Sequence, residues 1–254
     1  NTGVPTGLDL DGDGRLGAPR DAQGYGEFPG SKGMAILSRL PIDGTAVQDL
    51  GALLWRDLPG AIPPPLATAE GVQRLSTTGH WIVPVVLPDG RRLRLLTWYA
   101  TPPVFDGPED RNGRRNHDET AIWLRLLEGR LATPAPDAPF VILGDANLDV
   151  LDGEGRPAAL ATLLSHPAVQ DPRPRGTHGR VDPGHLGDAA LDTALYDESD
   201  GKAVGGLRVD YVLPSADLAV TASGVMWPAE GAPLAADLMA ASHHRPVWVD
   251  LNLP

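Results

Sequence analysis

The sequence predicts a mixed α/β (α+β) protein whose strands and helices stack in layers. About seven short apolar or β-branched runs are bounded by Gly, Pro, Asn or Asp, and two longer segments carry apolar residues at helical spacing. The two kinds of element are intermixed along the chain rather than confined to separate halves. Elements in such an order bury their apolar faces in a layered sandwich.

Composition narrows the possible functions. The 254 residues include 33 Asp and Glu against 21 Lys and Arg, a formal net charge of −12, which argues against a general nucleic-acid coat. The lack of cysteine excludes disulfide scaffolds, thiol nucleophiles and cysteine-based zinc sites. No apolar run approaches the roughly 18 residues of a membrane span. The length allows one large domain or two small ones.

The N-terminal part of the chain is poor in regular patterns. Residues 1–30 are rich in Gly, Asp and Pro and have no apolar period, which predicts one long acidic, Gly-rich loop. A strand is predicted at residues 34–38, entered through Gly33 and closed by Pro41. Residues 43–75 favour neither strand nor helix.

A hairpin and a helix follow. Strands are predicted at residues 81–87 and 91–98, because an Asp-Gly turn joins these two runs. A polar loop over residues 101–115 then leads to the clearest helix. Asn116 is a suitable N-cap, and Glu119 stands three residues later as in a capping box.

The C-terminal half alternates short strands with loops. The apolar run 140–143 predicts a buried strand, residues 157–164 predict a helix with Pro in its first turn, and residues 172–207 predict a second long loop. The last three predicted strands are residues 207–213, 218–226 and 247–251.

Polar residues at three strand ends are the candidates for chemistry. Asp145 and Asn147 directly follow a buried strand, a place suited to hold a metal-bound water and a phosphate oxygen, although a plain turn is the alternative. Asp210 lies inside an apolar run and therefore needs a cationic or hydrogen-bonded partner. His243 and His244 stand just before the last strand, and a His oriented by a buried Asp is a common general acid or base.

Together these elements resemble the endonuclease/exonuclease/phosphatase superfamily. The segment Ser38-Arg39-Leu40-Pro41-Ile42 is similar to the end of a strand of that family, and the helix after Asn116 takes the place of one of its helices. The loop at residues 102–107 and the Asn-Thr-Gly-Val-Pro start are similar to a bacterial, often exported subgroup. The resemblance implies a single domain over residues 1–254. Its fold would be a four-layer sandwich, with two mostly antiparallel sheets packed face to face between helices.

The resemblance also implies a metal-dependent phosphoesterase that cleaves a phosphodiester or a phosphomonoester. His244 would activate the attacking water or protonate the phosphoryl centre, oriented by Asp210. Asp145 would position or deprotonate the nucleophile, and Asn147 would bind a phosphate oxygen. Tyr99 falls where relatives carry a His or Tyr that contacts the phosphate, with a buried structural Tyr as the alternative. The implied substrate is a small molecule, a lipid headgroup or a nucleic acid, with no obligate protein partner.

The chain departs from the family pattern in its metal ligands. His243 stands where the family carries an acidic ligand, so His243 and Asp145 are the expected ligands of a Mg²⁺ or Mn²⁺ ion, with Zn²⁺ as a softer choice. The family's first strands bring an Asn and a metal-binding Glu, and neither is found before Gly33. We therefore expect those strands to lie outside the chain and the metal site to be incomplete without them.

Two further groups are candidates for binding. Asp9, Asp11 and Asp13 follow the Asp-x-Asp-x-Asp-Gly pattern of a calcium loop, but Arg20 stands where an EF-hand has Glu. A bound Ca²⁺ and an acidic surface loop are equally compatible with this pattern. Three arginines in the predicted loop before the helix are candidates to hold a substrate phosphate: Arg111, Arg114 and Arg115.

Two rival functions stay open. One is an inactive member of the same fold that acts as a calcium-stabilised binding or surface module. The other is an unrelated zinc hydrolase that uses His243, His244 and either His178 or His185, although no HExxH spacing is present. The subgroup resemblance, the lack of cysteine and the calcium-like loop together predict an extracytoplasmic location, either periplasmic or secreted.

Overall fold

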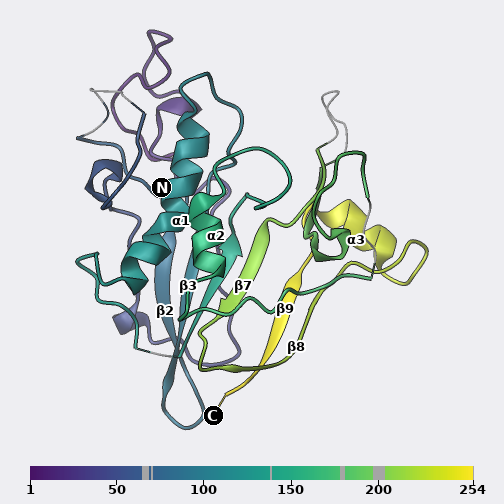
Figure 1. Cartoon of the computed structure of the whole chain (residues 1–254). Helices are drawn as coiled ribbons and strands as arrows, with labels where there is room; N and C mark the ends of the chain where they lie inside the picture. Colours follow the sequence, from purple (N-terminus) through teal and green to yellow (C-terminus); the bar gives the residue numbers. More distant parts are fainter. Residues whose placement is uncertain (65–68, 70, 138, 178–180, 197–203, 254) are drawn as a thin grey trace.

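A computed structural model of the chain describes residues 1–64, 69, 71–137, 139–177, 181–196 and 204–253 (Figure 1). The α-helices are α1 (Arg111–Leu127), α2 (Ala158–Leu164) and α3 (Ala235–Ala241). The strands are β1 (Gln48–Asp49), β2 (His80–Val86), β3 (Arg92–Tyr99), β4 (Phe140–Asp145), β5 (Ala194–Tyr196), β6 (Gly205–Leu207), β7 (Asp210–Pro214), β8 (Ala219–Val225) and β9 (Val247–Asn252).

A mixed five-stranded sheet with the order β1-β2-β3-β4-β7 forms the centre of the fold. β3 and β4 are parallel, whereas the other neighbouring pairs in this sheet are antiparallel. Tyr99 therefore pairs with Asp145, and Asp145 pairs with Asp210, so the ends of three strands meet at one edge of the sheet.

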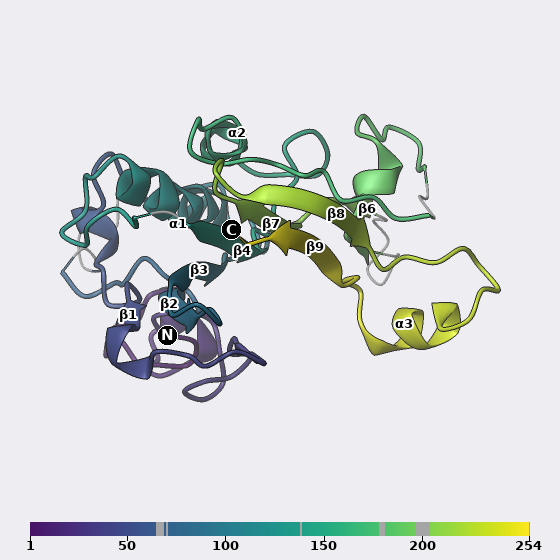
Figure 2. The ribbon, with the colours of Figure 1, turned by 90° about the horizontal axis from the view of Figure 1, so that it is seen from below.

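The two faces of this sheet pack differently. Helices α1 and α2 cover one face and enclose the main core, in which the fully buried indoles of Trp98 and Trp123 meet edge to face with their centroids 6.3 Å apart (Figure 1). The other face holds a smaller apolar cluster that includes Leu93, Val141 and Leu218. There Leu251 of the two-stranded β8–β9 ribbon packs against the sheet (Figure 2). The predicted α/β sandwich class is confirmed, and its second sheet is this short ribbon.

Several predicted elements are confirmed with small shifts in their ends. The hairpin strands are β2 and β3, and Gly90 in their connection has a φ of 86°. The helix at residues 157–164 is α2, with Pro157 as its N-cap. The strands at residues 140–143, 218–226 and 247–251 are β4, β8 and β9.

Other predictions are wrong, each because tertiary contacts override a local pattern. Residues 34–38 form no strand, and Leu37 is 93% exposed; pairing with β2 begins only at Ile42. Helix α1 begins five residues early, at Arg111, so Asn116 and Glu119 are buried inside the helix and do not cap it. The predicted loop over residues 172–207 contains β5 and β6 in its described part, and α3 was not predicted.

The strand predicted at residues 207–213 is split between two elements. Leu207 ends β6, which pairs with β5, and Asp210 begins β7, which pairs with β4. Among the described helices, none combines the length and the apolar character that a bilayer crossing requires.

Gly144 is expected to be essential for the central sheet. Its φ is 154°, and a Cβ there would lie 1.9 Å from the carbonyl oxygen of Trp98 on β3. We expect Gly144→Ala to lower the free energy of unfolding by about 3 kcal/mol or more, because the two strands must move apart. Gly44→Ala, where no atom lies within 4 Å of the new Cβ, is the control. Equal urea midpoints for the two variants would contradict this account.

Candidate active site

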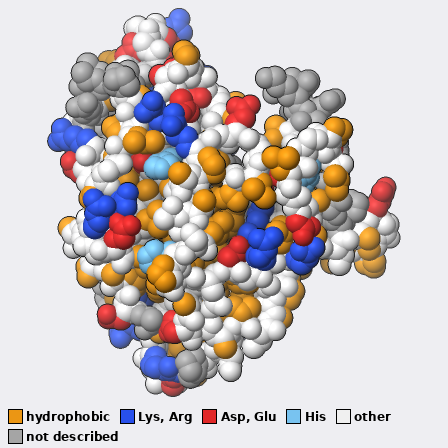
Figure 3. Space-filling view, in the orientation of Figure 1, with side chains coloured by type: hydrophobic (Ala, Val, Ile, Leu, Met, Phe, Trp, Pro, Cys, Tyr) orange, Lys and Arg blue, Asp and Glu red, His pale blue; other side chains and the backbone are white. Residues whose placement is uncertain are grey.

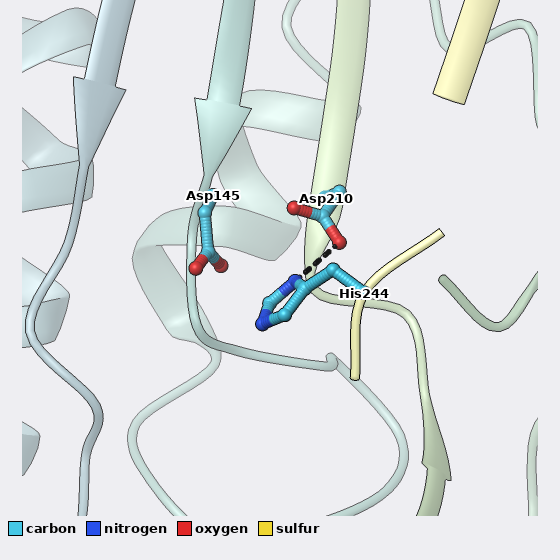
Figure 4. Close-up of side chains that lie close together, drawn as sticks. All are labelled: Asp145, Asp210 and His244. Atoms are coloured by element: carbon cyan, nitrogen blue, oxygen red, sulfur yellow. Dashed lines mark hydrogen bonds and ion pairs between the residues drawn. The ribbon is translucent and has the colours of Figure 1, made fainter. Parts of the chain in front are cut away.

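Three side chains from distant parts of the chain converge at one edge of the central sheet. Asp145 is the last residue of β4, Asp210 is the first residue of β7, and His244 lies in the turn before β9. The candidate ligand atoms of the three residues all lie within 4.8 Å of one another (Figure 4). The parallel pairing of β3 with β4 and the antiparallel pairing of β4 with β7 bring these residues together.

Asp210 and His244 form a hydrogen-bonded pair. Nδ1 of His244 lies 2.9 Å from Oδ2 of Asp210, which is the partner that a carboxylate in an apolar strand requires (Figure 4). This hydrogen bond raises the pKa of His244, and the carboxylate charges of Asp210 and Asp145 act in the same direction against the effect of burial. Because Nδ1 is engaged, Nε2 is the ring nitrogen that can exchange a proton with a substrate or water.

Asp145 is more deeply buried, and the residue is only 9% exposed. Its two carboxylate oxygens accept hydrogen bonds from the backbone N–H of Asn147 at 2.7 Å and from the Asn147 side-chain amide at 3.0 Å. Burial, and then the charge of Asp210 on the paired strand, raise the pKa of Asp145 to about 7. Two carboxyl groups and one imidazole are thus held close together with two of them titrating near neutrality.

Buried polar residues hold the site in place. Oγ1 of Thr193 accepts hydrogen bonds from the N–H groups of Val209 and Asp210, and its carbonyl accepts one from the N–H of Arg245. Asn116 of α1 donates from its amide to the carbonyls of Thr101 at 2.8 Å and Ala146 at 2.7 Å. Asn116, predicted as a helix cap, therefore joins the loops that follow β3 and β4.

Tyr99 and Asn147 lie beside Asp145. Tyr99 pairs with Asp145 in the sheet, and burial raises its phenol pKa, opposed by a hydrogen bond with Asn147. The side-chain nitrogen of Asn147 donates to the carbonyl of Ala100 at 2.8 Å and to Asp145. Both amide hydrogens are therefore used within the protein. This differs from the predicted contact with a phosphate oxygen and makes Asn147 a support for Asp145.

His243 lies outside the Asp145, Asp210 and His244 group, in contrast to its predicted role as a metal ligand. It is exposed, its Nδ1 lies 3.3 Å from the carbonyl oxygen of Leu195, and its ring is nearly parallel to that of Tyr196. Adjacent residues near a strand point in different directions, so His244 turns toward the carboxylates while His243 turns away.

The three arginines predicted to bind phosphate lie in the first turns of α1 and not in a loop. Arg115 is buried and donates to the carbonyls of Gln23, Arg74 and Leu75, so its guanidinium supports the fold. Arg111 donates to the side chain of Gln73, and Arg114 donates to backbone carbonyls. We therefore make no further use of these arginines as phosphate ligands.

The N-terminal acidic loop brings together a different set of residues from the predicted one. The carboxylate oxygens of Asp9, Asp11 and Asp21 lie within 4.8 Å of one another, whereas Asp13 is not in this group. Asp21 is buried and accepts hydrogen bonds from the N–H groups of Leu10 and Ala18, which folds the loop back on itself. The linear calcium pattern could not reveal Asp21, because its approach depends on this closure.

The histidines of the zinc-hydrolase alternative do not form one group. Nε2 of His185 lies 3.3 Å from Asp152 and 3.7 Å from Asp192, in a buried cluster distinct from that of His244. His178 lies outside the described residues.

Sequence reasoning missed Tyr196 at the site. Its hydroxyl lies 3.3 Å from Nε2 of His244. The segment was expected to be a loop, and the apolar triplet 194–196 that becomes β5 was its one local signal.

Comparison with known proteins agrees with this geometry. The profile of the Endonuclease/Exonuclease/phosphatase family matches residues 4–242. The chain belongs to this family. Members of the family hydrolyse phosphate esters and generally use a divalent metal. None of the curated proteins matches this chain.

Solved structures show the same fold at low sequence identity. The endonuclease/exonuclease/phosphatase from Beutenbergia cavernae aligns with a TM-score of 0.51 and 17% identity, over 85% of this chain and 46% of that protein. Sphingomyelinase C from Streptomyces griseocarneus aligns with a TM-score of 0.43 and 15% identity, over 84% and 62% of the two chains. A mannosyl-6-phosphatase from Bacteroides thetaiotaomicron aligns with a TM-score of 0.39 and 15% identity, over 70% and 59%. The chain thus spans about half of the length of the Beutenbergia protein.

The pKa of Asp145 predicts how stability depends on pH. The carboxyl holds its proton up to about pH 7 in the folded chain but loses it near pH 4 when unfolded, so stability falls as pH rises across this window. In chelator, Asp145→Asn is expected to make the loss of unfolding free energy between pH 5 and pH 8 smaller by about 2 kcal/mol. Asp217→Asn, at an exposed position, is the control. Parallel pH profiles for wild type and Asp145→Asn would contradict the burial effect.

Proposed function

We propose that this chain carries the catalytic residues of a metal-dependent phosphoesterase that hydrolyses a phosphodiester or a phosphomonoester. The observation that carries the proposal is the His244–Asp210 hydrogen bond of 2.9 Å next to the buried Asp145. An imidazole oriented by one carboxylate and facing a second one is suited to move a proton during attack of water on phosphorus. Membership of the family makes a phosphate ester the natural substrate.

The donor set fits a divalent metal ion. Asp145 and Asp210 face each other in register on neighbouring strands, and their mutual repulsion raises the pKa of Asp145. A cation between these carboxylates would relieve that repulsion, and oxygen donors with one imidazole suit Mg²⁺ or Mn²⁺. A bound divalent ion neutralises charge on phosphoryl oxygens and lowers the pKa of a water ligand.

The residues of the chain divide the remaining tasks. Asp210 accepts a hydrogen bond from Nδ1 of His244, so that Nε2 takes a proton from the attacking water or gives one to the leaving oxygen. Asp145, held by Asn147, orients the water. Tyr99, beside Asp145 on β3, donates its hydroxyl to the phosphoryl group.

The charge of the chain favours a small phosphate ester or a lipid headgroup over a long nucleic acid. The formal net charge is −12. On the described part of the face seen in Figure 3, basic side chains occur in small groups among acidic and apolar ones and do not form a continuous stripe. A long polyanion would be repelled over most of such a surface.

Removal of the imidazole tests the proposed reaction. We expect His244→Gln to lower kcat on a chromogenic phosphodiester or phosphomonoester about 1,000-fold, because proton transfer at Nε2 is lost. Turnover should require Mg²⁺ or Mn²⁺ and stop in chelator. His166→Gln, which changes a His that accepts a hydrogen bond from the N–H of Ala168, is the control.

The assay should use the product of the whole reading frame as well as this chain, because relatives are longer. Turnover by His244→Gln at the rate of His166→Gln would rule out the mechanism. Turnover in neither protein would favour the inactive member of the fold.

The acidic N-terminal loop favours calcium binding as the property of that second candidate. We expect Ca²⁺ to raise the melting temperature by about 5 °C, because a ligand that binds only the folded state stabilises it. Asp11→Asn should remove most of the rise, whereas Asp13→Asn should keep it, since Asp13 lies outside the group of three. Equal losses in the two variants would contradict this ligand set, and a rise in neither protein would contradict the site. An extracytoplasmic location stays a prediction.

A further inference from the structure

The hydroxyl of Tyr196 lies over the ring nitrogen of His244 that faces the reaction. The oxygen is 3.3 Å from Nε2, while Nδ1 of the same ring is taken by Asp210. The two rings meet edge to face, with centroids 6.1 Å apart and an angle of 87°. A substrate atom that reaches Nε2 therefore comes within reach of the phenol.

The backbone holds this arrangement in place. Tyr196 ends β5, whose first residue, Ala194, forms a bridge with His244. The N–H of Leu195 donates to the carbonyl of His243 at 3.0 Å. The phenol and the imidazole are thus carried on two directly hydrogen-bonded segments, so their relative position is set by the fold.

His243 covers the outer side of Tyr196. The two rings are nearly parallel, at 10°, with centroids 6.3 Å apart, and Nδ1 of His243 lies 3.3 Å from the carbonyl oxygen of Leu195. This contact accounts for a histidine that takes no part in the Asp145, Asp210 and His244 group. The adjacent histidines of the sequence therefore act on two sides of the same tyrosine.

The phenol is suited to donate a hydrogen bond and not to act as a base. Burial, followed by the charges of Asp145 and Asp210, raises the pKa of Tyr196 above its ordinary value, so the hydroxyl keeps its proton. Its contact of 3.3 Å with His244 is longer than a strong O–H bond. An anionic phosphoryl oxygen is a better acceptor and would take this hydrogen bond over.

We propose that Tyr196 is a catalytic residue that donates its O–H to a non-bridging phosphoryl oxygen of the substrate beside His244, and that His243 is a positioning residue that stacks on Tyr196. The inference rests on the proposed phosphoesterase function and adds a phosphate donor to it.

Loss of one oxygen atom tests the donor. Tyr196→Phe keeps the ring and its stacking, and we expect kcat/KM for the chromogenic ester to fall about 10- to 100-fold with unchanged metal dependence. Tyr25→Phe, which removes the hydroxyl of a tyrosine that is 57% exposed, should match wild type. Activity of Tyr196→Phe within twofold of wild type would overturn the proposal.

Substitution of His243 separates stacking from metal binding. We expect His243→Ala to lower kcat/KM about 5-fold and His243→Phe to restore most of it, because Phe can replace the stacked ring. The Mg²⁺ concentration for half-maximal activity should be the same in both variants. A large increase in that concentration in both variants would make His243 a metal ligand and overturn its positioning role.

Inorganic phosphate distinguishes failure of this inference from failure of the proposed function. In calorimetric titrations without ester, wild type should bind phosphate about 10-fold more tightly than Tyr196→Phe. If the ester is not hydrolysed, this difference would still support the donor while the proposed function fails. Equal phosphate affinity in the two proteins, or no binding to either, would overturn the inference even if wild type hydrolyses the ester.

Discussion

The pairing of β4 with its two neighbours is the constraint on which the rest of the structure depends. β4 runs parallel to β3 and antiparallel to β7, so Tyr99, Asp145 and Asp210 stand side by side at one edge. Gly144 lets β3 and β4 approach so closely, because its missing Cβ would collide with the carbonyl of Trp98. The price of this register is two carboxylates on adjacent strands, and the imidazole of His244 offsets part of their repulsion.

Helix α1 connects the core to the site through polar residues that are buried inside it. Its apolar side packs under the sheet, whereas Asn116 and Glu119 are fully buried and bonded to loops. Glu119 accepts hydrogen bonds from the N–H groups of Thr77 and Thr101, although burial raises its pKa. Buried polar groups of this kind are costly unless they are satisfied, so each hydrogen bond restricts the loops to one arrangement. The ends of β3 and β4 are therefore rigid where the side chains of the site begin.

How well each feature could be predicted follows from how local its cause is. The hairpin of β2 and β3 was predictable, because an Asp-Gly turn and apolar runs on both sides act over a few residues. Asp145, Asp210 and His244 were found because each is a polar residue next to a strand that ends or begins there. The start of α1 was misplaced, because Asn116 and Glu119 form a capping pattern whose side chains are instead used in tertiary hydrogen bonds.

The sequence by itself determined the α/β class, most of the strands and the residues able to form an Asp–His pair. These depend on local apolar patterns and on residue type. Only the tertiary structure decided that Tyr196 reaches His244, that His243 stacks on Tyr196, and that Asp21 joins Asp9 and Asp11. Such contacts depend on strand register and loop closure, and these are set by long-range packing that leaves no mark in the local sequence.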